Sequence, residues 1–167
     1  MSAQPIPGRV TAAADGDVVV FLIGMRVNRW RAVRHWVPTL LAMPRMLKEL
    51  ARDEHSGLLG SRLFASGPRD RAVIQYWESR EKLLAYAADR SKEHRPAWTA
   101  FNRRARDSEG AVGIWHETYV VPAGSYESIY SGMPETGLGK AYGIEPVGRR
   151  GERAAERFAS TGGEAAA

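Results

Sequence analysis

Residues 17–27 read Asp-Val-Val-Val-Phe-Leu-Ile-Gly-Met-Arg-Val, a stretch that is almost entirely apolar and rich in β-branched side chains. Strands that are covered on both faces carry such continuous apolar runs, whereas strands with one solvated face alternate between apolar and polar residues. The run therefore predicts a central strand of a sheet, packed on both sides. Arg26 lies near the end of this strand. We interpret it as an arginine whose aliphatic carbons lie on apolar surface while its guanidinium stays in water.

The sequence on either side of this strand predicts the rest of a small sheet with two helical regions. Pro38 and Pro44 interrupt the first helical pattern, so we expect a kinked helix or two shorter ones there. The expected elements are strands at 17–27, 60–66, 71–77 and 112–121, helices at 28–53 and after the capping Ser79, a helical segment from Pro96, and a short extra strand at 126–130. The order β, α, β, β, α, β is that of an α+β, ferredoxin-like fold with an antiparallel sheet.

The two ends of the chain carry no periodic apolar pattern. We expect a flexible N-terminal arm over residues 1–15, a ferredoxin-like domain with a C-terminal extension over 16–148, and a frayed helix or disordered tail over 149–167. In a ferredoxin-like fold the helices cover one sheet face. The apolar residues on both faces of the first and fourth strands therefore predict a partner sheet, most simply from a second copy in a homodimer.

Composition is that of an ordinary globular protein and excludes several classes of function. The 167 residues are 44% hydrophobic and 26% charged, with a net charge of +5 and no cysteine, which excludes disulfides, thiolate metal sites and a cysteine nucleophile. We find no signal-peptide pattern and no apolar run near the roughly 20 residues of a membrane span. We expect a cytoplasmic protein with no membrane partner. The scattered arginines match no nucleic-acid-binding motif, so we expect no nucleic acid partner.

Two histidines are candidates for chemistry. His94 lies at a break in the second helix, near Trp98, and such a histidine is a candidate haem ligand, base or substrate contact, or simply a capping residue. His116 and Glu117 lie within the fourth strand, where alternation sends them to opposite faces. A polar residue in so apolar a strand is either functional or satisfied by a structural hydrogen bond, and both interpretations stay open.

Tyr119, Tyr126 and Tyr130 form a run of phenols beside a glycine-rich segment. Core packing is the commoner explanation of such a run, but it also suits a pocket for a flat organic substrate. The sequence has no phosphate-binding loop, no dinucleotide-binding glycine pattern and no nucleophile elbow. His35 and His55 lack ligand partners at metal spacing, so we expect no metal site.

Three segments of the chain resemble a known family. They are Tyr76-Trp77-Glu78-Ser79 through Glu93-His94-Arg95-Pro96-Ala97-Trp98, then Val112-Gly113-Ile114-Trp115-His116-Glu117-Thr118-Tyr119, then Tyr126-Glu127-Ser128-Ile129-Tyr130-Ser131-Gly132-Met133-Pro134. They resemble small bacterial and fungal monooxygenase-family proteins, which are similar to the antibiotic-biosynthesis monooxygenases. The resemblance implies a dimeric α/β barrel and oxidation of polycyclic phenols without metal or flavin. Other relatives in the superfamily bind haem through a helix histidine that follows a tryptophan-bearing strand, the order in which Trp77 and His94 stand here.

We therefore expect a small-molecule monooxygenase or related tailoring enzyme that acts on a phenolic or polyketide- or terpenoid-like substrate and requires no cofactor. The candidate catalytic residues are His94, His116 and Glu117; either histidine would take a proton from an acidic phenol or enol, so that the carbanion reacts with oxygen. The candidate substrate-binding residues are all aromatic: Trp77, Trp98, Tyr119, Tyr126 and Tyr130. Two alternatives stay open, a haem-binding protein of the dimeric α/β barrel type with His94 as axial ligand, and a non-catalytic binding or stress-response module.

Overall fold

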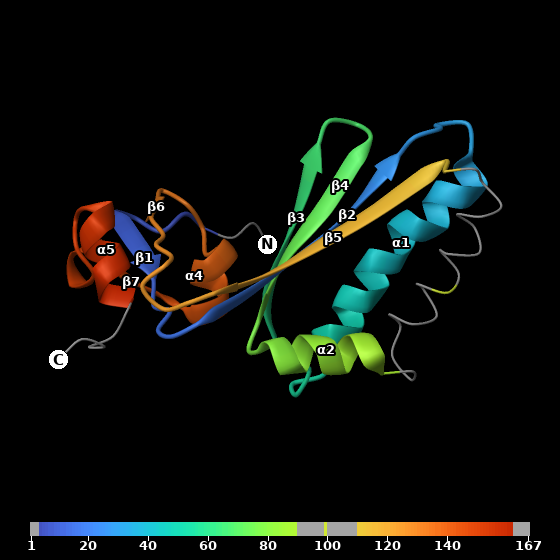
Figure 1. Cartoon of the computed structure of the whole chain (residues 1–167). Coiled ribbons are helices and arrows are strands. Elements are labelled where there is room, and N and C mark those ends of the chain that lie inside the picture. Colours follow the sequence, from blue (N-terminus) through green and yellow to red (C-terminus); the bar gives the residue numbers. More distant parts are fainter. Residues whose placement is uncertain (1–3, 90–98, 100–109, 162–167) are drawn as a thin grey trace.

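The computed structural model describes residues 4–89, 99 and 110–161, and its largest feature is a four-stranded antiparallel sheet (Figure 1). The strand order is β3-β4-β2-β5. Helices α1 (Val33–Leu50) and α2 (Arg80–Ala88) lie between the strands in sequence and on one side of the sheet in space. The strands are β2 (Val18–Val27), β3 (Leu58–Ser66), β4 (Asp70–Trp77) and β5 (Val112–Val121). The order βαββαβ is therefore as predicted.

β2 is the central strand that its apolar run predicted. It pairs antiparallel with β4 on one side and with β5 on the other. On the face toward the helices, Val19 packs with Leu50 of α1 and Leu83 of α2, while Met25 and Val27 belong to a second buried cluster. Because successive side chains of a strand point to opposite faces, Val18, Val20 and Leu22 lie on the side that α1 and α2 leave uncovered.

α1 is one helix, although Pro38 and Pro44 lie inside it. The structure thus excludes the two shorter helices that we considered. Each internal proline costs about 3 kcal/mol in an otherwise regular helix. Burial of Met46 and Leu50, and packing of Leu40 against a core cluster of the sheet, offset that cost.

The start of α2 is as the sequence predicted. Ser79 Oγ accepts a hydrogen bond from Lys82 N at 3.1 Å, and Glu81 lies in the first turn. The helical segment expected from Pro96 lies outside the described residues. Within the described ranges, none of the helices is both long enough and apolar enough to cross a membrane.

A second, smaller sheet has the strand order β6-β1-β7 and brings distant parts of the chain together. We name this sheet and the helices that accompany it the lobe. Figure 1 shows the lobe at the end of the large sheet, away from α1 and α2. Its elements are β1 (Arg9–Ala12), β6 (Tyr130–Ser131), α4 (Gly137–Tyr142), β7 (Ile144–Pro146), the 3-10 helix η1 (Val147–Arg149) and α5 (Ala154–Thr161).

The flexible arm expected over 1–15 contains β1 of the lobe, and the frayed helix or disordered tail expected over 149–167 contains its helix α5. Ala12 and Ala14 are buried and form a core cluster with Val18 and Leu138, and residues 154–161 form α5. The strands of the lobe have only two to four residues each. So few residues cannot show the alternation by which a strand is recognised in sequence.

Two arginines hold the lobe together. Arg157 is 5% exposed and donates to Glu127 Oε2 at 2.8 Å and to two backbone carbonyls. Arg150 donates to Asp15 Oδ1 at 2.8 Å and also forms an ion pair with Glu145. Because Arg150 and Asp15 lie 135 residues apart in sequence, this network joins the two ends of the described chain.

Candidate active site

His116 lies on the helix-facing side of the large sheet. It pairs with Ile23 of β2 and shares its face with Ile114, which packs against a cluster between the sheet and α1. The imidazole centroid lies 5.8 Å from that of the Phe21 ring, with 39° between the ring planes. His116 is exposed. An accessible imidazole beside an aromatic ring can hold a flat molecule and exchange a proton with it.

A buried amide and an enclosed tryptophan lie beside this position. Gln75 pairs with Phe21 across the sheet, is 4% exposed, and accepts a hydrogen bond from Trp77 Nε1 at 3.0 Å. Trp77 is 0% exposed, and its ring lies 5.8 Å from that of Tyr86. Tyr86 OH in turn donates to Glu49 Oε2 at 3.2 Å and links α2 to α1. Trp77 was expected to bind substrate, but its ring is fully buried in this structure. It packs in the core cluster between the sheet and the two helices.

Glu117 and Tyr119 lie on the opposite face from His116, as strand alternation predicted. We name this uncovered side the open face. Tyr119 OH donates to Glu117 Oε2 at 2.9 Å, and this bond to the carboxylate raises the pKa of Tyr119 because it stabilises the protonated phenol. Trp115 covers Gly24 on the same face, where a Cβ would lie 2.5 Å from the indole.

The other two tyrosines belong to the lobe. Tyr126 OH donates to Gly16 O at 2.7 Å, and burial raises the pKa of Tyr126. Tyr130 OH accepts a hydrogen bond from Gly139 N at 3.1 Å. The structure therefore does not bring the expected phenols to His116, because these two fill the lobe and Tyr119 lies across the sheet.

His94 and Trp98 lie outside the described residues, and their roles stay predictions. Among the residues that the structure describes, no group of three His, Cys, Asp or Glu side chains is placed to hold a metal ion. Of the expected catalytic residues that the structure describes, His116 lies on the helix-facing side of the sheet. Glu117 is engaged by Tyr119 on the other side.

Comparison with known proteins assigns the chain to a family. Residues 18–138 match the family described as Monooxygenase af470-like. The chain belongs to this monooxygenase-like family. Monooxygenase af470 of Aspergillus fumigatus is 31% identical over 149 residues, a match that covers 77% of this chain and 52% of that protein. The af470-like chain thus spans about half the length of this curated relative.

Solved structures align with this af470-like protein at low sequence identity. Aldoxime dehydratase OxdRE, crystallised with butyraldoxime, aligns with a TM-score of 0.56 and 16% identity over 87% of this chain and 40% of that chain. The cofactor-independent oxygenase SnoaB of Streptomyces nogalater aligns with a TM-score of 0.44 and 16% identity over 62% of this chain and 91% of that chain. Identities this low concern the fold alone. With the observed topology, the OxdRE likeness supports the α+β, ferredoxin-like assignment, whereas the closed dimeric barrel stays a prediction.

The sequence analysis did not identify Gln75 or Phe21 of this af470-like protein as neighbours of the site. For Gln75, the sequence does contain a recognisable pattern. Val73, Gln75 and Trp77 alternate onto one face, and the two apolar members are fully buried. A polar residue between two inward apolar residues marks a buried amide that needs a hydrogen-bond partner. Phe21 carried no signal, since any apolar residue suits a central strand.

Proposed function

We propose that this chain is an oxygenase-type enzyme that acts on a small phenolic or enolic molecule of polyketide or terpenoid type, between the large sheet and its helices. Membership of a monooxygenase-like family supports the class of reaction. The observation that carries the choice of site is the exposed imidazole of His116, 5.8 Å from the Phe21 ring on the helix-facing side. A flat ring stacked on Phe21 lies within reach of that imidazole.

His116 acts in this proposal as a general base. It removes a proton from an acidic methylene group that is activated by a neighbouring phenol or enol, and the carbanion adds to molecular oxygen with formation of a C–O bond. The hydroperoxide anion takes the proton back from His116 and then loses water. In the net reaction one methylene group and one molecule of oxygen give one carbonyl group and one molecule of water, and the substrate supplies all the electrons. The proposed reaction therefore needs no bound cofactor to supply or accept electrons.

The test measures oxygen uptake by the purified chain with a panel of polycyclic phenols and enols. His116→Gln removes the base, and His55→Gln is the matched control because His55 is exposed in the segment between α1 and β3. Loss of a general base lowers a rate by about 10²–10⁴-fold, so we expect that fall for His116→Gln and none for the control. Melting curves of both variants separate loss of function from loss of fold.

The outcomes distinguish the proposal from its alternatives. A folded His116→Gln protein that consumes oxygen at the parent rate overturns His116 as the base. A parent protein that binds these compounds but never consumes oxygen identifies a binding module. A shifted Soret band after stoichiometric addition of haem, lost in His94→Ala, identifies the haem-binding alternative.

A further inference from the structure

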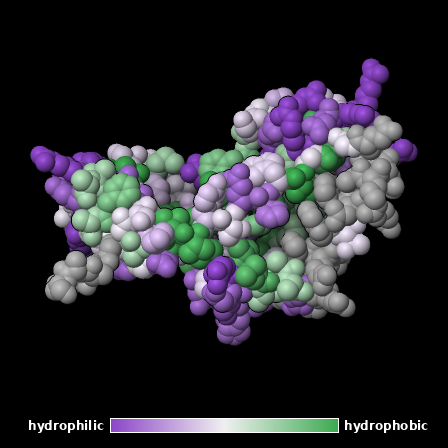
Figure 2. Space-filling view, viewed as in Figure 1, coloured by the Kyte–Doolittle hydropathy of each residue, from purple (hydrophilic) through white to green (hydrophobic). Residues whose placement is uncertain are grey.

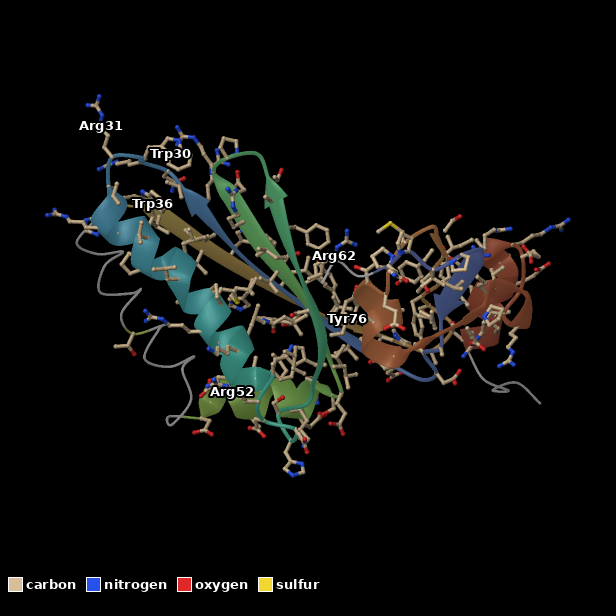
Figure 3. All side chains as sticks on the ribbon, turned by 180° about the vertical axis from the view of Figure 1, so that it is seen from behind. Trp30, Arg31, Trp36, Arg52, Arg62 and Tyr76 are labelled. Atoms are coloured by element: carbon tan, nitrogen blue, oxygen red, sulfur yellow. The ribbon has the colours of Figure 1, made fainter. Side chains whose placement is uncertain are left out.

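Gln75 is a buried amide whose hydrogen-bond donors are unused. The side chain lies on the helix-facing side of β4, because it alternates with Tyr76, which packs against the lobe (Figure 3). The residue is 4% exposed, and its Oε1 accepts the hydrogen bond from Trp77 Nε1 at 3.0 Å. Nε2 carries two protons and has no hydrogen-bond partner among the residues that the structure describes.

Trp77 determines which atom of this amide is which. An indole nitrogen donates and cannot accept, so the atom that faces it has to be the amide oxygen. For Trp77 alone any acceptor would be sufficient, whereas glutamine adds two N–H groups that the indole cannot use. Buried polar groups are nearly always paired, and an unpaired donor is costly. The N–H groups of Gln75 therefore indicate an acceptor other than the described residues.

The surroundings of this amide are largely apolar. On the same face of β4, its neighbours Val73 and Trp77 are 1% and 0% exposed. Gln75 pairs with Phe21 on one side and with Ser61 on the other, and no hydrogen bond joins it to that serine. Figure 2 shows apolar side chains gathered between the lobe and the helical layer. An acceptor that reaches Nε2 in such surroundings forms a stronger hydrogen bond than it does in water.

Gln75 and His116 lie on opposite sides of Phe21. β4 and β5 flank β2, so Gln75 is the neighbour of Phe21 on one side, and His116 approaches its ring from the other, with the ring centroids 5.8 Å apart. Neighbouring strands are about 4.8 Å apart and two residues of a strand span about 6.8 Å, which places the Cα atoms of Gln75 and His116 about 12 Å from each other. Side chains that extend from both positions on this face bracket a flat ring placed on Phe21.

We propose that Gln75 binds the oxygen of the substrate, with Nε2 as donor to a phenolic or enolic oxygen of a ring that lies on Phe21. The consequence for catalysis rests on the proposed function, because His116 creates the charge that Gln75 stabilises. When His116 removes a proton from the acidic carbon, the electron pair left on that carbon is shared with the conjugated oxygen. The oxygen thereby becomes more negative, and donors that are fixed before the reaction stabilise such a charge without reorganisation.

Trp77 also fixes the direction of this donor. Rotation of the amide by half a turn would bring Nε2 against Trp77 Nε1, so that two donors would face each other. The buried indole therefore keeps Oε1 on its own side and leaves Nε2 on the other side of the amide carbon. The tryptophan thus determines the orientation of the amide from within the core.

The test compares the binding of pentafluorophenol, which is ionised at neutral pH, with that of its uncharged methyl ether, pentafluoroanisole. Titration calorimetry of the full chain measures both affinities. Gln75→Met removes the donor at nearly the same volume, and we expect it to weaken phenolate binding by about 10- to 100-fold while the ether binds as before. Gln75→Glu keeps an acceptor for Trp77 but replaces the donor by a carboxylate, so it should weaken phenolate binding at least as much. Gln4→Glu, the same change at an exposed position, should leave both affinities unchanged.

A measurement on the parent chain decides the role of Gln75 if its variants fail to fold. The chain contains two glutamines, Gln4 and Gln75, so isotope-labelled glutamine gives two side-chain amide signals in an NMR spectrum, and Gln4→Glu identifies that of Gln75. We expect pentafluorophenol, and not the ether, to move the amide protons of Gln75 downfield. An amide signal that the phenol leaves in place overturns the assignment. So does a Gln75→Met protein that binds both ligands like the parent or loses both equally.

The outcomes also separate the role of Gln75 from the proposed function. If Gln75→Met loses the preference for the phenolate and the parent consumes no oxygen with the panel of phenols and enols, Gln75 is the oxygen-binding residue and the oxygenase proposal is overturned. If the parent consumes oxygen and Gln75→Met binds the phenolate as the parent does, the proposed function is supported and the role of Gln75 is overturned.

Discussion

Replacement of Arg157 by methionine tests what holds the lobe together. The side chain is 6% exposed and donates to Glu127 Oε2 at 2.8 Å, to Gly151 O at 3.2 Å and to Glu152 O at 2.9 Å. Methionine keeps the aliphatic volume but leaves Glu127, whose side chain is 24% exposed, without its counter-charge. Removal of one partner from a fully buried pair costs about 3–5 kcal/mol. Because water reaches Glu127 in part, we expect a loss of about 2–3 kcal/mol in the free energy of unfolding.

The assay is urea unfolding and thermal melting followed by circular dichroism. For a chain of this length, the expected loss lowers Tm by about 5–10 °C. Arg153→Met is the control, because Arg153 is an exposed arginine immediately before the same helix. Adding Glu127→Gln to Arg157→Met should recover part of the loss, since it removes the uncompensated carboxylate charge. If Arg157→Met unfolds within about 0.5 kcal/mol of the Arg153→Met control, the ion pair does not hold the lobe and the reasoning fails.

Two further predictions concern Gly24 and the buried phenols. Gly24→Ala should cost about 1–3 kcal/mol and shift tryptophan emission to the red, because the new Cβ would lie 2.5 Å from the Trp115 indole; an equal cost in a Trp115→Ala background would contradict this contact. Burial raises the pKa of Tyr76 and of Tyr142. As the pH rises, these phenols therefore lose their protons in the unfolded chain before they lose them in the folded protein. Their contribution to the free energy of unfolding should be complete below about pH 10 and decrease above it. Tyr142→Phe has no such proton to lose and should flatten the fall, as measured by unfolding titrations between about pH 10 and 12; an unchanged slope would argue against the raised pKa.

The central part of the fold could be predicted because its signals are local. The apolar run at 17–27 and the segment at 112–121 lie within one residue of β2 and β5 at each end. Alternation along a strand also separated His116 from Glu117, and the register confirms that separation. Both inferences need only the neighbours of a residue in sequence.

The lobe and the tyrosines could not be predicted because their partners lie far away along the chain. β1 is four residues long and pairs with β6 and β7, so its own sequence shows too little of a pattern. Tyr126 and Tyr130 suggested a pocket, yet their hydroxyls bind backbone groups of Gly16 and Gly139. Those contacts depend on the path of the whole chain.

The pairing of β1 with later strands also sets an order of events while the protein is being made. Ala12 N donates to Ser128 Oγ, 116 residues further along the chain. Ribosomes add about 5–20 residues each second, so Ser128 is synthesised roughly 6–23 s after β1. During that interval Val10 and Ala12 have no strand to join, and a chaperone can bind them. The lobe is therefore the last part of the described chain to close during translation.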